Sequence, residues 1–382
     1  MRGIEEVIDQ TEFEKLLRSK KKLRLKLGVD PSSPDIHLGH AVILRTLAKL
    51  QKLGHKVIFL VGDTTALIGD PSGKNKTRPV LTQGQVDTNA KTYLDQVGKI
   101  LDTSKAEIRR NSEWLNPLKL VDILKLAGQF TVAQLIERDD FSKRLKEGSD
   151  LGLHELLYPL MVAYDSVALE ADVEFGGTDQ RFNLLAGRAL QKKLGQTPQQ
   201  VVISKLLVGT DGVQKMSKSL GNYIGIADAP ADMFGKVMSI PDHLMAAYYD
   251  LCTDIEPDII EELVKTIAEG ANPRDAKASL AREIVSMYHS ADAAEKAEAA
   301  FNAQFRDGEL PEDIAEANTE LGLRQVDELL VELKLADSRS EARRLLDQGG
   351  VRISGQRIEN DSVTVASGDV IQVGKRRFIQ VK

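Results

Sequence analysis

The sequence predicts an α/β protein: a doubly wound parallel sheet domain with a helical insertion, followed by an all-α domain and a small α+β domain. Three patterns indicate the sheet. Residues 23–29 alternate apolar and polar positions, and apolar residues then recur at helical spacing from Leu38 to Leu50. The continuous apolar run Lys56–Gly62 is typical of a strand buried on both faces. A second alternating strand, Ala171–Phe175, ends in two glycines and leads into another helical pattern.

The first strand, its helix and the apolar run form a βαβ unit. Because such crossovers are right-handed, the loops at 30–40 and 62–73 meet at the carboxyl ends of neighbouring strands. Doubly wound folds bind their ligands at this edge of the sheet. We therefore expect site residues in these two loops.

The rest of the chain predicts separate units, because helical, acidic and strand-rich patterns follow one another. The acidic stretch with Gly308 and Pro311 is poorly periodic, as a linker is. The expected boundaries are a sheet domain at 1–225 with a helical insertion at about 84–165, an all-α domain at 226–306, a linker at 307–324 and a small α+β domain at 325–382.

The composition excludes several classes of protein. Among 382 residues Cys252 is the only cysteine, so intramolecular disulfides and multi-cysteine metal clusters are excluded, and we expect no metal site. No apolar stretch approaches the ~20 residues that cross a bilayer, and the start of the chain lacks an apolar signal segment. We expect a cytoplasmic protein without membrane contact. The net charge of −6 does not indicate nucleic-acid binding, although a local basic patch still can.

The first candidate site is the segment Pro34–His40, where the first loop enters its helix. His37 and His40 share one face of the first helical turn, where unpaired N–H groups and the helix dipole favour an anion. Gly39 lets a nucleobase or a phosphate chain approach the backbone closely. The alternative is a pair of surface or metal-binding histidines, but no third ligand follows in the pattern.

A second candidate is the segment Leu67–Lys74, which follows a strand and ends in Gly-Lys. It is not a P-loop, because only three residues separate Gly69 from Gly73 and Asn75 follows the lysine. Asp70 either holds a ligand ammonium by a charge-assisted hydrogen bond or shapes an Asp-Pro turn, and local sequence favours the turn.

The third candidate is the glycine-flanked segment Lys215–Asn222. Lys215 and Lys218 are two point charges on a loop, suited to neutralising a triphosphate as charge moves toward pyrophosphate. Alone, such a loop is usually a solvated basic turn. Together with the histidine pair it indicates nucleotide chemistry.

The two segments His-Leu-Gly-His and Lys-Met-Ser-Lys-Ser resemble, in order, the signature motifs of class I aminoacyl-tRNA synthetases. Neighbouring segments resemble those of the bacterial tyrosyl enzymes: Leu27–His40, Val61–Lys74, Tyr158–Leu169, Asp172–Asn183 and Leu206–Tyr223. The resemblance covers essentially the whole chain. It implies a Rossmann-like catalytic domain, an anticodon-side helical domain, and a homodimer with the insertion near its interface.

The resemblance also implies the reaction. Tyrosine attacks the α-phosphate of ATP, giving tyrosyl-adenylate and pyrophosphate, and the tyrosyl group then passes to the terminal adenosine of tRNA(Tyr). Mg²⁺ is implied together with ATP. No protein nucleophile is needed, so catalysis consists of positioning and charge stabilisation.

Site residues follow from the same resemblance, position by position. The catalytic group is His37, His40, Lys215, Lys218 and Ser219. The expected ATP-binding residues are Ser32, Gly39, Gly177, Asp179 and Met216. The expected tyrosine-binding residues are Gly28, Asp30, Asp70, Tyr158, Asp165 and Gln180, with Asp165 on the phenolic hydroxyl, Tyr158 and Asp70 on the ammonium, and Gln180 near the carboxylate end.

Two positions depart from the family pattern. Val162 stands where a glutamine usually helps to bind the substrate amino group. Three explanations are open: Asp70 or Gln180 replaces the missing contact to the amino group, water fills the space, or the preferred amino acid differs. We favour replacement of the contact by Asp70 or Gln180. Lys26 stands where some tyrosyl enzymes place a second ligand of the hydroxyl, so that contact is in question.

The last domain resembles the small RNA-binding domain of a ribosomal small-subunit protein. Its expected tRNA-binding residues are Arg339, Arg343, Arg344, Lys375, Arg376 and Arg377. Intervening acids also allow an ordinary solvated surface. Two other functions compete with ligation: a non-catalytic RNA-binding homologue, disfavoured by the intact histidines and lysines, and a nucleotidyltransferase, disfavoured by the lysine loop and the tail.

Overall fold

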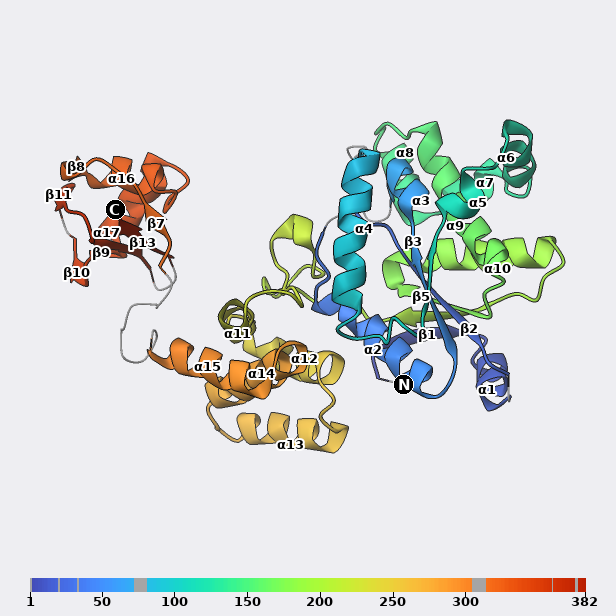
Figure 1. The fold of residues 1–382 in the computed structure, drawn as a ribbon, viewed down its shortest axis with the longest axis horizontal. Helices are drawn as coiled ribbons and strands as arrows, with labels where there is room; N and C mark the ends of the chain where they lie inside the picture. Colours follow the sequence, from blue (N-terminus) through green and yellow to red (C-terminus); the bar gives the residue numbers. More distant parts are fainter. Residues whose placement is uncertain are drawn as a thin grey trace. The chain divides into compact units, whose positions relative to one another are not determined.

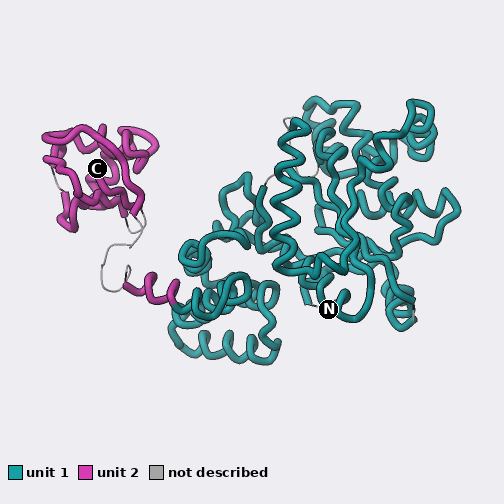
Figure 2. Tube along the Cα trace, viewed as in Figure 1, with its two compact units in different colours: residues 1–295 teal, residues 296–382 magenta. Residues whose placement is uncertain are grey.

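The computed structural model describes residues 2–19, 21–32, 34–71, 81–303, 314–358, 360–374 and 377–382. The chain divides into two compact units, residues 1–295 and 296–382 (Figure 2), and each is described by itself. No helix within the described ranges is both long and apolar enough to span a bilayer.

Unit 1 is built on a six-stranded sheet with the order β1-β6-β5-β2-β3-β4, counted over its described residues. All neighbours are parallel except β1, which runs antiparallel to β6 at the edge. The strands are β1 (Ile4–Ile8), β2 (Arg24–Val29), β3 (Lys56–Val61), β4 (Glu107–Arg110), β5 (Val173–Gly177) and β6 (Gln200–Ser204). The predicted α/β class with a parallel sheet is confirmed.

Helices cover both faces of this sheet, with α4 on one side and α9 and α10 on the other (Figure 1). The predicted βαβ unit is β2, α2 and β3, and residues 57–61 of β3 are buried as the apolar run indicated. The helices up to β6 are α1 (Gln10–Arg18), α2 (Leu38–Lys52), α3 (Asp63–Ile68), α4 (Gln83–Val97), α5 (Ser112–Leu115), α6 (Leu120–Ala127), α7 (Val132–Ile136), α8 (Asp139–Lys146), α9 (Leu153–Ala168) and α10 (Arg181–Lys193).

The segment expected to be a helical insertion also contains a strand. β4 pairs in parallel with β3 and extends the main sheet. Its sequence, Glu107-Ile108-Arg109-Arg110, is mostly charged and only half-buried, so neither apolar alternation nor an apolar run marks it. Backbone pairing holds it at the edge, assisted by an ion pair between Arg24 and Glu107 at 3.2 Å.

A helical part follows the sheet. Its helices are α11 (Pro230–Met238), α12 (Met245–Cys252), α13 (Pro257–Ala268), α14 (Pro273–Tyr288) and α15 (Ala291–Asn302). Helix α11 packs on α14, and both contribute fully buried apolar residues such as Phe234 and Ile284. Three of these helices begin with proline, which fits the first turn because its missing N–H has no intrahelical partner there.

Unit 2 carries a small α+β core. Its sheets have the orders β10-β9-β12-β13-β7 and β11-β8. The elements are β7 (Glu316–Ala317), β8 (Gly322–Gln325), α16 (Val326–Glu332), α17 (Arg339–Asp347), β9 (Val351–Ile353), β10 (Gln356–Arg357), β11 (Ser362–Val365), β12 (Val370–Val373) and β13 (Arg377–Val381). Leu329, Leu330 and Ile371 are fully buried in its core.

Two strands of unit 2 lie inside the segment 307–324 that was expected to be a linker. β7 pairs with β13, and β8, which begins at Gly322, pairs with β11. Both are too short for periodicity to mark, and their pairing depends on strands much later in the chain. Residues 304–313 of the same stretch lie outside the described residues.

Candidate active site

The candidate site lies where the parallel strands end. β2 is followed by the loop that leads into α2, β5 by Thr178–Gln180, and β6 by the segment that carries the two lysines. Because β2, β5 and β6 are parallel, these connections leave the same, carboxyl edge of the sheet.

His37 and His40 lie against each other at the start of α2. Their ring centroids are 3.8 Å apart, and the ring planes meet at 28°. The backbone N–H of His37 donates to Nδ1 of the His40 ring at 3.3 Å. Because Nδ1 of His40 accepts, the proton of its neutral ring belongs on Nε2. Within the described part of the chain, Nδ1 of His37 is buried without a hydrogen-bond partner.

Both histidines are held in the neutral form. Burial lowers the pKa of His37 to about 2, and the neighbouring His40 and Lys215 lower this pKa further. Burial also lowers the pKa of His40 to about 4, although the Asp179 carboxylate partly opposes this. At neutral pH each ring therefore offers one N–H donor rather than a full positive charge.

Backbone pairing brings the lysine segment to the histidines. Leu38 N–H donates to the carbonyl of Ile224 at 2.9 Å, and Ile226 N–H donates to the carbonyl of Ile36 at 3.0 Å. A Cβ placed on Gly39 would lie 3.1 Å from the His37 ring and 3.8 Å from Cβ of Met216. The absence of a side chain at Gly39 thus keeps the space between the two segments open.

Each lysine is paired with a carboxylate. Nζ of Lys215 lies 2.5 Å from Oδ2 of Asp179, and Lys218 makes a short contact with Asp35. Asp179 was expected in the site from the sequence, whereas Asp35 was not. The position of Asp35, two residues before His37, could have indicated a place in the site. Its contact with Lys218 becomes visible only in the fold.

Asn222 organises the lysine segment and was not singled out from the sequence. Its side chain is buried, accepts from Ser217 N–H at 2.8 Å, and donates to Asp211 at 2.8 Å and to the Lys215 carbonyl at 3.1 Å. The hydroxyls of Ser217 and Ser219 lie 3.0 Å apart. These contacts hold the two lysines at fixed places on their loop.

A second cluster contains Asp30, Asp70, Tyr158 and Gln180, the last of which directly follows Asp179. The Tyr158 hydroxyl donates to Oδ2 of Asp30 at 3.0 Å, and Gln180 Nε2 donates to Oδ2 of Asp70 at 3.0 Å. Burial raises the pKa of Asp30 to about 7, and the neighbouring Asp70 adds to the rise. A cationic group already faces Asp70, because Nη2 of Arg138 lies 3.8 Å from its Oδ1.

Asp165 lies deeper, on the same helix as Tyr158. It is 3% exposed, and its carboxyl accepts from Nε1 of Trp114 at 2.8 Å and from Nδ2 of Asn111 at 3.3 Å. Burial raises its pKa to about 7. Neither Trp114 nor Asn111 was predicted, because they lie in the inserted segment and no local pattern links them to Asp165.

The remaining predicted residues lie on the same edge without direct contacts to the histidines. Ser32 N–H donates to the Asp30 carbonyl at 2.7 Å, and its side chain is exposed. Gly177 ends β5, where a Cβ would come within 2.8 Å of Asp179. Gly28 lies in β2 between Lys26 and Asp30. Within the described residues no three His, Cys, Asp or Glu side chains form a metal-binding group.

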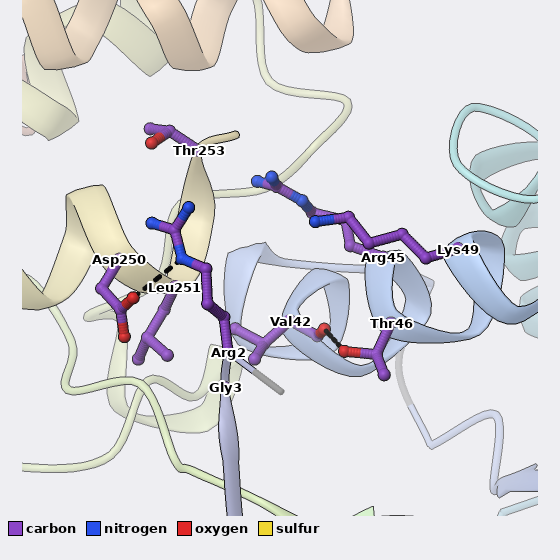
Figure 3. A pocket seen from close by; sticks show the side chains of 9 residues that line it. All are labelled: Arg2, Gly3, Val42, Arg45, Thr46, Lys49, Asp250, Leu251 and Thr253. Carbon is purple, nitrogen blue, oxygen red and sulfur yellow. Dashed lines mark hydrogen bonds and ion pairs between the residues drawn. The ribbon is translucent and has the colours of Figure 1, made fainter. Parts of the chain in front are cut away.

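A separate small pocket lies along α2, between the start of the chain and α12 (Figure 3). Its basic side chains have carboxylate partners. Nε of Arg2 lies 2.9 Å from Asp250, and Arg45 and Lys49 lie 2.7 Å and 3.0 Å from Asp254. These ion pairs therefore link the start of the chain and α2 to the helical part, and the basic side chains of the pocket are already paired.

The expected tRNA-binding residues of unit 2 differ in their surroundings. Arg339, Arg343 and Arg344 are all exposed on α17, and Nε of Arg343 and Nη2 of Arg339 also lie 2.9 Å and 3.0 Å from Asp327. Arg377 donates to the Leu335 carbonyl at 2.6 Å. The predictions for residues 375 and 376 lie outside the described residues.

Family models match both units. The model of class I tRNA synthetases, the tryptophan and tyrosine group, matches residues 18–306, and the S4 domain model matches residues 324–371. These matches confirm the resemblance inferred from the two motifs and from the tail.

Full-length relatives agree with the family models. A tyrosine–tRNA ligase of Dehalococcoides mccartyi is 55% identical over 379 residues, which is 99% of this chain and 96% of that protein. One of Bordetella pertussis is 53% identical over 386 residues, or 100% and 94%. The Archaeoglobus fulgidus tyrosyl-tRNA synthetase complexed with L-tyrosine is similar in structure, with a TM-score of 0.63 and 26% identity over 78% of this chain and 97% of that one. This chain therefore belongs to the class I tRNA synthetases, in their tryptophan and tyrosine group.

Proposed function

We propose that this chain joins tyrosine to tRNA(Tyr) at the expense of ATP. In the first step a carboxylate oxygen of tyrosine bonds to the α-phosphorus, the bond to the β-phosphate oxygen breaks, and pyrophosphate leaves. In the second step a terminal adenosine hydroxyl attacks the tyrosyl carbonyl, and AMP leaves. The observation that carries this proposal is the backbone pairing of residues 36–38 with 224–226, which joins the histidine pair to the lysine loop.

The histidines and lysines bind the polyphosphate. Nε2–H of His40 and a ring nitrogen of His37 donate to phosphate oxygens, and Lys215, Lys218 and Ser219 add charge and a hydroxyl. The carboxylates that now pair with the lysines are exchanged for phosphate oxygens when ATP binds, and Asp179 is then free to accept from the ribose. Ser32, Gly39, Gly177 and Met216 complete the ATP site. Mg²⁺ bound with ATP offsets part of the phosphate charge.

The second cluster and Asp165 bind tyrosine. Asp70 and Tyr158 hold the ammonium beside Asp30, and Gln180 lies toward the carboxylate end. Asp165 accepts from the phenolic hydroxyl, while Gly28 leaves room over β2 for the ring. A buried carboxylate that finds no donor is costly, so a ring without a hydroxyl is rejected.

The test is amino-acid-dependent exchange of pyrophosphate into ATP, measured with tyrosine, phenylalanine, tryptophan and close analogues of tyrosine. We expect exchange with tyrosine well above the others. Exchange with none of them would favour the non-catalytic RNA-binding homologue, and exchange led by another amino acid would mean that the preference has changed.

Val162 provides a prediction about the amino-group site. It lies one helical turn after Tyr158 and three residues before Asp165 on α9. The Gln180 amide that donates to Asp70 is itself held by Asn183 at 2.7 Å, which supports compensation for the missing glutamine. We expect Val162→Gln to change the tyrosine dissociation constant by less than about tenfold. A gain of roughly ten- to a hundredfold, the size of a lost hydrogen bond to a charged group, would contradict compensation.

The basic tail predicts salt-dependent tRNA binding. If unit 2 contacts the phosphate backbone, the logarithm of the association constant falls linearly with the logarithm of salt concentration. Arg344→Ala is expected to weaken binding and to reduce that slope by about 1. Arg18→Ala, which removes an exposed arginine of α1, is the matched control. A slope near zero for the intact chain would argue against a phosphate-binding tail.

We also infer a homodimer that acts in the cytoplasm. The inserted segment exposes several large apolar side chains, among them Leu120, Leu124 and Val132 at 72%, 60% and 65%. We expect light scattering to give twice the chain mass, and Leu120→Lys with Leu124→Lys to give the monomer. Leu53→Lys, at a 75% exposed position outside this segment, should leave the dimer intact. A monomeric intact chain would refute the inference.

A further inference from the structure

The ammonium group of Lys26 is buried at one end of the strip of surface over Gly28, where the proposed function places the tyrosine ring. Lys26 and Gly28 lie on one face of β2, and Asp30 is the first residue after the strand. Contacts show that this face looks toward α9, because Asp30 accepts from Tyr158 and Lys26 donates to Ser166. A Cβ on Gly28 would lie 3.9 Å from Cε of Lys26. The strip over Gly28 therefore runs from Asp30 at one end to Lys26 at the other.

All three protons of the Lys26 ammonium have acceptors. Nζ lies 2.7 Å from Oε1 of Glu174 on β5, 2.9 Å from the Ser166 hydroxyl and 3.4 Å from the Val162 carbonyl. Glu174 also accepts from Ser166 at 2.9 Å and from Gln199. Lys26 is 0% and Glu174 3% exposed. With its donors used, Lys26 acts on the site through its charge and not as a second ligand of a substrate hydroxyl.

The charge lies beside Asp165, because Val162 and Ser166, whose oxygens Nζ of Lys26 contacts, flank Asp165 on α9. Burial raises its pKa to about 7, while the positive charge of Lys26 opposes the rise and the negative charge of Glu174 adds to it. Asp30, which directly follows β2, is a further negative neighbour, and Trp114 and Asn111 face the carboxyl as donors. The carboxyl is therefore balanced between its two forms near neutral pH, where a neighbouring charge decides which form prevails.

We propose that Lys26 is a specificity-determining positioning residue, whose buried charge favours the ionised form of Asp165 and so makes the pocket favour a hydroxyl donor on the substrate ring. The proposal rests on the proposed function and names what sets its selectivity. An ionised carboxyl only accepts hydrogen bonds, so a ring without a hydroxyl leaves it unsatisfied. A protonated carboxyl is less costly to bury beside a bare ring, and discrimination falls.

The chain contains a built-in probe of this charge. Trp114 is the only tryptophan, and its indole N–H donates to Asp165. We expect the fluorescence of the ligand-free protein to titrate with a midpoint near pH 7 and this transition to disappear in Asp165→Asn. This measurement needs no catalytic activity, so its outcome is separate from success or failure of the proposed function.

Two variants should move the midpoint in opposite directions. Glu174→Gln leaves the ammonium unopposed and is expected to lower the midpoint of the titration. Lys26→Met combined with Glu174→Gln removes both charges and is expected to raise the midpoint by about one pH unit. Lys26→Arg keeps the charge and should leave it near the original value. Arg144→Met with Glu155→Gln neutralises another buried ion pair, 2.7 Å apart, and is the matched control.

The specificity arm uses pyrophosphate exchange. At pH 7 the ratio of kcat/KM for tyrosine to that for phenylalanine is expected to fall roughly five- to tenfold in the double variant, because a shift of one unit changes the ionised fraction by that much. Thermal unfolding checks that each variant is folded. A midpoint that does not move in the folded double variant, or one that moves without a change in this ratio, would overturn the proposal.

Discussion

Replacement of His40 by alanine is expected to slow tyrosyl-adenylate formation roughly 100- to 1,000-fold, with little change in tyrosine affinity. The neutral ring accepts a hydrogen bond at Nδ1, which leaves Nε2–H as a fixed donor at the edge of the lysine loop. Losing one preorganised donor that acts mainly in the transition state costs about 2.7–4 kcal/mol. Single-turnover adenylate formation and equilibrium tyrosine binding measure the two quantities separately.

His154→Ala is the matched control for this variant, because its side chain is exposed at the start of α9. It should leave both quantities unchanged. A large loss of tyrosine affinity in the His40 variant would show that this histidine supports the amino acid pocket rather than the phosphates.

Replacement of Asp165 by asparagine is expected to reduce the preference for tyrosine over phenylalanine by roughly 100- to 10,000-fold. Tyrosine loses a hydrogen bond to a charged acceptor, worth about 1.5–3 kcal/mol, and phenylalanine no longer faces an unsatisfied carboxylate, which costs about 1–3 kcal/mol. Sites built to bind a hydroxyl, tyrosyl enzymes among them, reject the analogue without it by about 10⁴–10⁵. The ratio of kcat/KM values in pyrophosphate exchange measures the change.

Asp232→Asn, an exposed carboxylate of α11, is the control for the loss of one negative charge. Trp114 and Asn111 keep their places in both proteins if the fold is intact. An unchanged tyrosine-to-phenylalanine ratio in the Asp165 variant would mean that another group binds the ring hydroxyl.

Local sequence patterns predicted the elements whose formation depends on residues close together in the sequence. The alternation before Gly28 and the apolar run of β3 depend on neighbours in sequence, and the structure has strands at both places as expected. The grouping of His37 with Lys215 followed from their shared suitability for phosphate chemistry and from the resemblance of the two motifs.

What the sequence could not show depends on contacts between distant segments. Nothing in the charged residues of β4 marks it as a strand, because its stability comes from pairing with β3. Trp114 meets Asp165 only because α5 follows that strand. The partner of Lys26 is Glu174 because β2 and β5 lie in register, with these two residues opposite each other. Register across a sheet follows from the whole packing and is not contained in either strand alone.

The hydrogen bonds between Ile36, Leu38, Ile224 and Ile226 limit how the lysine loop can move relative to the histidines. They fasten the downstream flank of the lysine loop to the first turn of α2, so a swing of that loop has to pivot before Ile224. Gly221, with a φ of 68°, lies at that point and adopts a backbone conformation that other residues rarely take. We therefore expect any movement of the lysine loop to involve residues before Ile224, while the backbone contacts of Ile224 and Ile226 with the start of α2 stay in place.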